Sequence, residues 1–370
     1  MHHSLSKRIF KKKLYEWHKS GARPHPWKST HDPYRIWLSE IILQQTRVET
    51  GTVYYIKFVE RFPSINDLAN ASLEEVYELW KGLGYYSRAK NLHLSAQIIM
   101  TEYQGVFPTK YEDILSLKGV GPYTAAAIAS FAYDLPYPVV DGNVKRVISR
   151  YVGYEKNILA SSAHSDILAL LRDDIFDEKH PAKFNQAVMD FGATVCKPKG
   201  ALCKSCLLRE SCYAYKSDKV SVLPVRINKI KRKVRYFHFI VIAKGQSILF
   251  QQRTEKDIWQ NLYQFPMIES SSIDPLQKEE LLSYLEETFK IDIRATEIKM
   301  KGPLKQLLTH QKIIARFYHG ISVSEAHDLP ADSAYIWMKP DKYHQIAVPK
   351  TIDWYLNDNS ISLFTLNTQE

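Results

Sequence analysis

The sequence predicts a multidomain protein in which an all-α domain is followed by an α+β domain. At 370 residues the chain is about twice the commonest domain size, which favours two domains over one. Through residues 1–215, apolar side chains recur at helical spacing, with Gly or Pro between most of the segments. Residues 216–233 lose this periodicity and gain positive charge, so we expect a linker there. Strand-like patterns follow over residues 234–358, and we expect residues 359–370 to form a frayed tail.

The helical domain is predicted from amphipathic segments, none of which reaches the roughly 18 apolar residues of a membrane span. The most apolar segment, residues 123–133, is typical of a buried helix. The N-terminus carries basic residues but no apolar core or cleavage site of a signal peptide, so we expect a cytosolic protein without membrane attachment. Nothing in the sequence indicates more than a monomer. The clearest helical segments read YRIWLSEIILQQT, LEEVYELWKGLG, KNLHLSAQIIMTEY, YTAAAIASFAY and FNQAVMDFGATVC.

The second domain mixes strands with at least one helix. Residues 275–290 have the spacing of an amphipathic helix. Runs rich in β-branched and aromatic residues predict strands, the first two of them joined by a turn at Lys244 and Gly245. The predicted strands cover residues 236–243, 248–251, 313–323 and 334–338.

The formal net charge of +10 is concentrated in one segment. Between Cys196 and Arg235 there are twelve Lys or Arg residues and only two acids, Glu210 and Asp218, so this segment alone accounts for the net charge. Concentrated positive charge is typical of a surface that binds a polyanion such as nucleic acid. A solvated, flexible basic linker would have the same composition, and charge alone does not separate the two.

All four cysteines fall within seventeen residues, with the spacing C-x6-C-x2-C-x5-C. Disulfides of a secreted protein close longer loops, so clustering indicates a metal site. One short pair flanked by two longer loops favours the four corners of an iron–sulfur cluster, and we expect a 4Fe–4S cluster. Structural zinc, which usually takes two short pairs, is the alternative. The four candidate ligands are Cys196, Cys203, Cys206 and Cys212.

The run LKGVGPYT joins two predicted helices through residues that suit phosphate binding. Gly119 and Gly121 permit backbone conformations closed to other residues, and Pro122 suits the first turn of the second helix. Such a turn points unpaired N–H groups at a helix N-terminus, where an anion binds well. We therefore predict a helix–hairpin–helix phosphate clamp made by Lys118, Gly119, Val120 and Gly121, with a tight corner without a ligand as the alternative.

Two carboxylates are placed in contrasting environments. Glu40 shares a helix face with Ile36, Trp37 and Leu43, so burial is expected to raise its pKa and keep it protonated. Asp141 follows an extended Pro-Val-Val stretch and opens a helix. A proton donor to a leaving group and an anion that faces an oxocarbenium-like centre are what glycosidic cleavage uses. The alternatives are a Glu40 that reaches water at a rim and an Asp141 that only caps its helix.

Together these segments resemble the MutY family of adenine DNA glycosylases. WLSEIILQQT, GLGYYSRAKNLH, LKGVGPYT, VVDGNVKRV, FNQAVMDFGA and the four cysteines match that family's motifs in the family's order, and the match covers essentially the whole chain. The resemblance implies base excision from double-stranded DNA that contains adenine opposite 8-oxoguanine or guanine, with the adenine flipped into a pocket.

The resemblance also implies roles for individual residues. Glu40 would protonate the base, Asp141 would stabilise the sugar cation, and Asn143 would orient the groups around it. Gln45 and Tyr85 match positions that insert into the duplex at the lesion.

A segment that contains Arg23, Trp27 and Lys28 matches the side of the pocket. Gln186 matches a family position whose residue type varies, so it receives no role.

Tyr123 separates this sequence from the related endonuclease III-like enzymes. Those enzymes carry a lysine at this position, which forms a Schiff base and gives strand-cutting lyase activity. Tyr123 has no amine, so the resemblance implies a monofunctional glycosylase that leaves an abasic site.

The second domain resembles the family's MutT-like, Nudix-fold recognition domain. Alignment of Glu286 and Glu287 with the last pair of the Nudix helix puts Leu282 and Ser283 where a hydrolase needs Arg and Glu, so its metal site is incomplete. Recognition of 8-oxoguanine is the implied role.

The family often reads this base with a Phe-Ser-His loop, and here the residues are Leu308, Thr309 and His310. The replacement of Phe by Leu predicts weaker stacking, since an aromatic contact with a base contributes roughly 1–3 kcal/mol.

Three other functions remain as alternatives. An endonuclease III-like lyase conflicts with Tyr123, and a nucleotide pyrophosphatase conflicts with the incomplete metal helix. A non-catalytic, cluster-bearing protein that only binds mispairs would make Glu40 dispensable.

Overall fold

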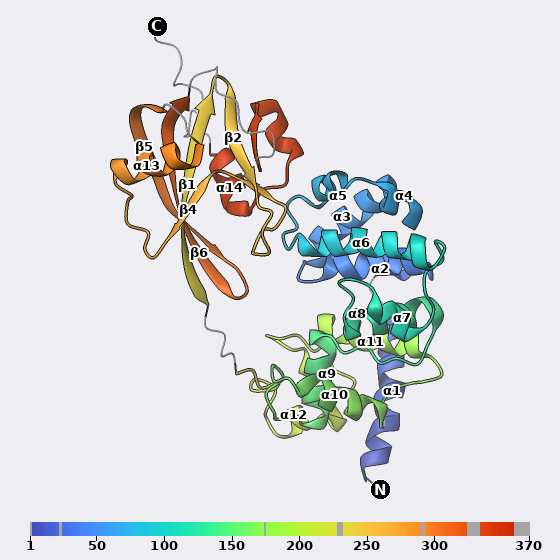
Figure 1. Ribbon diagram of the computed structural model, residues 1–370. Helices are drawn as coiled ribbons and strands as arrows, with labels where there is room; N and C mark the ends of the chain where they lie inside the picture. The colour runs from blue at the N-terminus through green and yellow to red at the C-terminus, as the bar shows by residue number, and fades with distance from the viewer. Residues whose placement is uncertain are drawn as a thin grey trace. The chain divides into compact units, whose positions relative to one another are not determined.

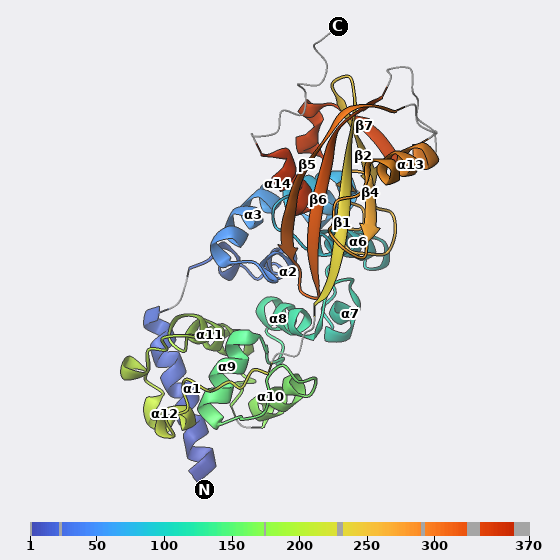
Figure 2. The ribbon, with the colours of Figure 1, turned by 90° about the vertical axis from the view of Figure 1, so that its left-hand side faces the viewer.

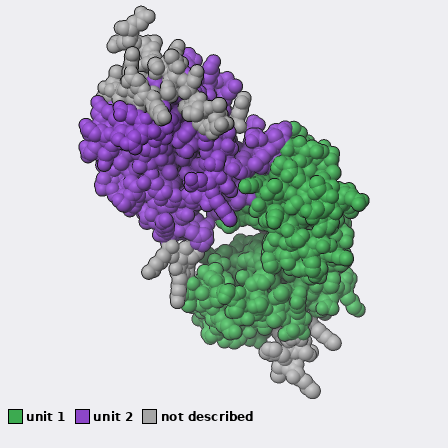
Figure 3. Space-filling model, in the orientation of Figure 1, with its two compact units in different colours: residues 1–71, 88–229 green, residues 72–87, 230–370 purple. Residues whose placement is uncertain are grey.

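The computed structural model divides the chain into two compact units, shown in different colours in Figure 3. The first unit comprises residues 1–71 and 88–229, and the second comprises residues 72–87 and 230–370. Contacts thus group residues 72–87, which the sequence assigns to the helical domain, with the second unit. The structure describes residues 2–21, 24–173, 175–227, 232–289, 293–323 and 334–358.

The described part of the first unit is built from helices and short 3-10 turns. Helix starts follow local chemistry: Asp32 caps the helix that contains Glu40 by accepting a hydrogen bond from the Tyr34 N–H. Ser64 forms a capping box with Asp67 at another start. The helices are α1 (His2–Gly21), α2 (Pro33–Leu43), α3 (Val48–Arg61), α4 (Ile65–Asn70), α6 (Ser87–Glu102), α7 (Tyr111–Ser116), α8 (Pro122–Tyr133), α9 (Gly142–Val152), α10 (Ala163–Arg172), α11 (Pro181–Thr194) and α12 (Tyr213–Lys216), with 3-10 turns η1 (Pro26–Lys28), η2 (Cys203–Ser205) and η3 (Arg209–Ser211).

One hydrophobic cluster joins the N-terminal helix to the helices that follow the hairpin. Phe10 and Leu14 of α1 are fully buried among apolar residues of α9, α10 and α11. Phe10 lies against Tyr151, and Trp17 packs edge-on to Phe191. Figure 2 shows α1 beside α11. The helices that carry Asp141 and lead into the cysteine loop therefore share one core.

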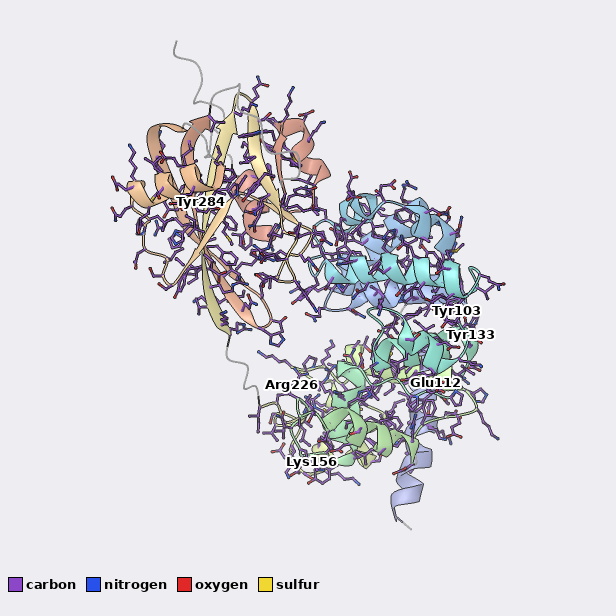
Figure 4. All side chains as sticks on the ribbon, viewed as in Figure 1. Tyr103, Glu112, Tyr133, Lys156, Arg226 and Tyr284 are labelled. Carbon is purple, nitrogen blue, oxygen red and sulfur yellow. The ribbon has the colours of Figure 1, made fainter. Side chains whose placement is uncertain are left out.

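Residues 216–227, predicted as linker, pack on the first unit instead of running free. Leu223 is 2% exposed, and the Ile158 N–H donates to the Val225 carbonyl. Asn157 binds both the N–H and the carbonyl oxygen of Ile227. Arg226, labelled in Figure 4, lies on this docked segment. Residues 228–231 of the predicted linker lie outside the described residues, and its last residue, Lys233, is the first of β1 (Lys233–Lys244). The predicted tail also lies outside the described residues.

The described part of the second unit contains a seven-stranded mixed sheet with apolar cores on both faces. Figure 1 shows the ribbon of this sheet. Strands run in the order β3-β2-β1-β6-β5, with β4 paired to β1 and β7 paired to β2. Only the β1–β6 pairing is parallel among the described pairs. The core on one face includes residues of α14, and the core on the other includes residues of α13. The elements are α5 (Leu73–Trp80), β1 (Lys233–Lys244), β2 (Ser247–Gln252), β3 (Tyr263–Gln264), β4 (Met267–Ser270), α13 (Lys278–Phe289), β5 (Ile293–Leu307), β6 (Gln311–Val323), β7 (Tyr335–Met338), η4 (Pro340–Gln345) and α14 (Lys350–Leu356).

The sequence patterns did not predict β5, β3, β4 or α14. Strand β5 is an edge strand whose register with β6 shifts twice, so its apolar residues do not alternate regularly. It also contains Gly302 and Pro303, residues that edge strands tolerate and central strands do not. The predicted helix over 275–290 begins at Lys278 in the structure.

Candidate active site

Glu40 lies in the C-terminal half of α2, where every residue from Ile36 to Ile42 is buried. Its side chain is 7% exposed. Burial raises the pKa of Glu40 to about 7, the negative charge of Asp141 adds to this rise, and a hydrogen bond from Tyr123 opposes it. A carboxyl group with this pKa is about half protonated at neutral pH and can donate a proton.

Asp141 is the N-cap of α9. Its Oδ1 accepts from the Val144 N–H at 2.6 Å, and its Oδ2 accepts from Asn143 Nδ2 at 2.7 Å. Burial raises the pKa of Asp141, whereas these hydrogen bonds and the charge of Arg146 lower it. The structure thus shows the capping role. Capping leaves a carboxylate held rigidly beside Glu40, so the two roles are compatible.

Tyr123 connects the two carboxylates from the first turn of α8. Its hydroxyl donates a hydrogen bond to Glu40. Burial is the largest cause that raises the pKa of Tyr123, and the charges of Glu40 and Asp141 raise it further. A neutral phenol is therefore maintained at this position. Glu40, Tyr123 and Asp141, from three different helices, are close enough to influence one another's protonation.

Asn143 is held from the side opposite Asp141 by a buried arginine. Arg146 donates to Asn143 Oδ1 at 2.8 Å, to the Gly192 carbonyl at 2.7 Å and to the Cys196 carbonyl at 2.7 Å. A Cβ at Gly192 would lie 2.7 Å from the Asn143 Cβ, so only glycine permits this approach of α11 to α9. The carboxylate end of α9 is thereby tied to the first residue of the cysteine loop.

The hairpin at residues 118–121 is a tight turn between α7 and α8. Gly119 has φ of +77°, and a Cβ there would meet the Asn91 Cβ at 2.8 Å. Gly121 is the N-cap of α8 with no side-chain cap, and nothing lies within 4 Å of where its Cβ would be. Lys118 is exposed beside it. The uncapped N–H groups of α8 and this cation would suit an anion.

The two residues predicted to insert into DNA share an unusual backbone conformation. Gln45 has φ of +56° and Tyr85 has φ of +50°, although neither is glycine. Both side chains are exposed. Within the second unit, the Tyr85 hydroxyl lies 3.1 Å from Thr309 Oγ1, which brings together two residues that the sequence predicts in separate domains.

The residues at the loop between β5 and β6 differ in solvent exposure. Leu308, which aligns with the family's aromatic residue, is half-buried and packs against the sheet core. His310 is exposed, and Leu307 is 66% exposed. On α13, Ser283 Oγ donates to Glu287.

The four cysteine thiols line one small cavity of about 30 Å³. Its other walls are mainly apolar and include Val147, Phe191 and Leu208. Within the described residues, no three His, Cys, Asp or Glu side chains are gathered closely enough to hold one metal ion. Four thiols around one cavity are a donor set that suits either an iron–sulfur cluster or a zinc ion.

Burial raises the pKa of the Cys206 thiol to about 11, and burial also raises the pKa of the Cys203 and Cys212 thiols. Arg150 approaches Cys196 Sγ at 3.4 Å and would donate to a bound thiolate.

The segment predicted at the pocket side is anchored by a residue that the sequence did not single out. Lys28 Nζ lies 2.8 Å from both carboxylate oxygens of Asp190, and His18 Nε2 lies 3.4 Å from one of them. Trp27 is buried against Tyr55. Arg23 lies outside the described residues. The sequence did carry one signal for Asp190, which is that it is a charged residue within the apolar FNQAVMDFGA helix.

Comparisons with known proteins identify the families to which the two parts of the chain are similar. A family model described as HhH-GPD superfamily base excision DNA repair protein matches residues 38–172, and a NUDIX domain model matches residues 237–358. These matches confirm the predicted fold class, a helix–hairpin–helix domain followed by a Nudix-like domain. Within the described residues, no helix has the length and apolar character needed to cross a membrane.

Several curated relatives carry the same name. The adenine DNA glycosylase of Buchnera aphidicola subsp. Acyrthosiphon pisum is 37% identical over 79% of this chain and 81% of its own length. That of Buchnera aphidicola subsp. Schizaphis graminum is 32% identical over 93% of this chain and 96% of its own length. The mouse protein is 41% identical over 59% of this chain and 44% of its own length.

Among solved structures, a thermostable thymine-DNA glycosylase matches with a TM-score of 0.53 and 29% identity, covering 57% of this chain and 97% of that one. A trapped endonuclease III–DNA covalent intermediate, at a TM-score of 0.50 and 22% identity over 57% of this chain and 98% of that one, shares the fold.

Proposed function

Because the chain belongs to the adenine DNA glycosylase family, we propose that it excises adenine paired with 8-oxoguanine or guanine in duplex DNA and leaves an abasic site. The observation that carries this proposal is a buried Glu40, with a pKa of about 7, that interacts with both Asp141 and Tyr123. The substrate also favours action in the bacterial cytosol, at the nucleoid.

The proposed reaction divides acid and anion roles between the two carboxylates. With adenine flipped out of the stack, Glu40 donates its proton to a ring nitrogen of the base. The glycosidic bond then breaks, its electron pair leaves with adenine, and Asp141 stabilises the cationic sugar. Water adds to the sugar C1′ and gives its proton to Glu40, which restores the acid. Asn143 holds Asp141 in place.

Tyr123 supports a reaction without strand cleavage. A lyase needs an amine that attacks the sugar to form a Schiff base. Tyr123 offers a hydroxyl whose pKa is raised well above its ordinary value and which donates to Glu40. We assign it to tuning the acid.

Cys196, Cys203, Cys206 and Cys212 would hold a 4Fe–4S cluster. The cluster would fix the basic loop that carries Lys197 and Lys199 for phosphate contact, in keeping with the positive charge of this segment. A straw-brown preparation with visible absorption that is lost in the Cys203→Ser variant would support this assignment.

DNA contacts would come from three places. The hairpin at residues 118–121 would bind phosphate, Gln45 and Tyr85 would enter the duplex, and the loop with Thr309 and His310 would read the opposite base. The hydrogen bond between Tyr85 and Thr309 supports a shared role in that reading. Because Leu308 is half-buried, the loop offers little stacking surface at this position.

The direct test measures adenine release by the full chain from duplexes with adenine opposite each of the four bases and opposite 8-oxoguanine. We expect release opposite 8-oxoguanine and guanine only, with no product trapped by borohydride. Efficient trapping would indicate a lyase, and binding without release would indicate a protein that only marks mispairs.

A further inference from the structure

The helix that carries Glu40 ends in a conformation that glycine normally provides. Helix α2 has its C-cap at Gln44, and the next residue, Gln45, adopts the left-handed region. Helices that end in this way usually have glycine at that position because a Cβ is strained there. For another residue the conformation is strained, so surrounding contacts must impose it.

Arg88 supplies those contacts. It is 8% exposed, and its Nη1 donates to the carbonyl oxygens of Ile41 at 3.0 Å, Ile42 at 2.9 Å and Gln44 at 2.5 Å. Nη1 also lies 3.4 Å from Thr46 Oγ1. These groups lie before and after the strained residue, so one guanidinium closes the turn around it.

The turn is held from a second side by the hairpin helix. Gln44 Nε2 lies 3.3 Å from Thr124 Oγ1, and Thr124, in the first turn of α8, is 2% exposed. The Thr46 N–H returns to the Leu43 carbonyl at 3.2 Å. The backbone on both sides of Gln45 is therefore fixed, while its side chain is exposed.

We propose that Arg88 is a positioning residue for mispair recognition, which holds Gln45 in the left-handed conformation that presents its side chain to the duplex. This inference deepens the proposed function and rests on it. Arg88 touches no reacting atom in this scheme. Its positive charge also suits the negative end of α2.

A double-mutant cycle separates positioning from simple stabilisation. Arg88→Lys keeps the charge, but the lysine side chain ends one bond short of the position of Nη1, the nitrogen that makes all of these contacts. Gln45→Ala removes the side chain that Arg88 would position. The two single variants and the double variant of the full chain are compared with wild type, using a duplex whose mispaired adenosine is 2′-fluorinated to resist cleavage.

Two quantities are measured for each protein. The first is the ratio of dissociation constants for the mispaired and fully paired duplexes. The second is the fluorescence of 2-aminopurine placed beside the mispair, which increases when the stack is opened. Arg253→Lys is the matched control, because Arg253 is also a largely buried arginine that binds a loop carbonyl, that of Ile258.

We expect Arg88→Lys to weaken mispair discrimination roughly tenfold, in line with the cost of the strained conformation, and to reduce the fluorescence increase. In the Gln45→Ala background the same change should have no further effect, because the side chain to be positioned is gone. Arg253→Lys should leave both quantities at wild-type values.

Equal effects of Arg88→Lys with and without the Gln45 side chain would overturn the proposal, as would unchanged discrimination and fluorescence. If Arg88→Lys does not fold, Arg88→Gln takes its place with the same criteria. Adenine release by the wild-type protein is assayed in parallel. Failure to release adenine refutes the proposed function. Normal adenine release, together with effects of Arg88→Lys and Gln45→Ala that simply add in the double variant, refutes only the role of Arg88.

Discussion

The C-terminal half of α2 and the N-terminus of α9 each present a carboxylate to the same site under different conditions. Glu40 lies within an apolar helix. Of the causes that shift its pKa, only the hydrogen bond from Tyr123 lowers the pKa. Asp141 lies at a helix N-terminus and accepts hydrogen bonds from Val144 and Asn143. Burial raises the pKa of both, but helix position decides how much of that rise is cancelled.

This difference teaches how one fold obtains an acid and an anion from similar groups. The interior of a helix has no free N–H groups, so Glu40 keeps its proton up to about pH 7. The first turn of a helix has free N–H groups, so hydrogen bonds to Asp141 offset part of the rise that burial causes in its pKa. Each prediction below removes one part of this contrast.

The largest effect is expected for Glu40→Gln, which keeps the shape of the side chain but cannot donate a carboxyl proton. Single-turnover adenine release should fall by about 10²–10⁴-fold, the usual contribution of a general acid. Binding of the mispaired duplex should be unchanged, because the variant alters no charge that faces phosphate. Retention of the wild-type rate would favour a protein in which Glu40 is structural.

A somewhat smaller effect is expected for Asp141→Asn. Asparagine caps helices about as well as aspartate, so the thermal midpoint should change little. The loss of negative charge should lower the rate of adenine release roughly 10²–10³-fold, as for other electrostatic groups at a reacting centre. A large fall in the midpoint with a proportionate loss of activity would mean that capping is its main role.

Glu40→Gln should lower the activity of the protein but raise its stability. The folded-state pKa of Glu40 is about 7 and its ordinary value is 4.5, so ionisation destabilises the folded state progressively as pH rises from 4.5 to 7. Glu40→Gln should therefore raise the free energy of unfolding by about 3 kcal/mol above pH 7 and by little near pH 4.5. Urea unfolding at pH 5 and pH 8 measures this, and an equal difference at both values would contradict it.

The smallest effect is expected for Tyr123→Phe. The tyrosine hydrogen bond stabilises the Glu40 anion, so its removal should raise the pKa of Glu40 by roughly one unit. The decline of activity at alkaline pH should shift upward by that amount, while borohydride trapping stays absent. An unchanged or downward shift would show that Tyr123 does not bind Glu40.

The sequence predicted the parts of this site that local patterns encode. The apolar stripe around Glu40, the glycines of the hairpin and the cysteine spacing each carry their chemistry within a few residues. Arg146 and Arg88 were missed because they bind backbone carbonyls 46–50 and 44–47 residues away, which no sequence pattern marks. Asp190 was missed because the Lys28 side chain that it binds is 162 residues away. Strand β5 was missed because an edge strand with shifted register lacks regular alternation.

The most direct test of the acid–anion contrast is the pH dependence of single-turnover adenine release by the wild-type protein. We predict a rate that falls about tenfold per pH unit above an apparent pKa near 7, where Glu40 loses its proton. A rate that stays constant from pH 6 to pH 9 would contradict the assignment of Glu40 as the proton donor.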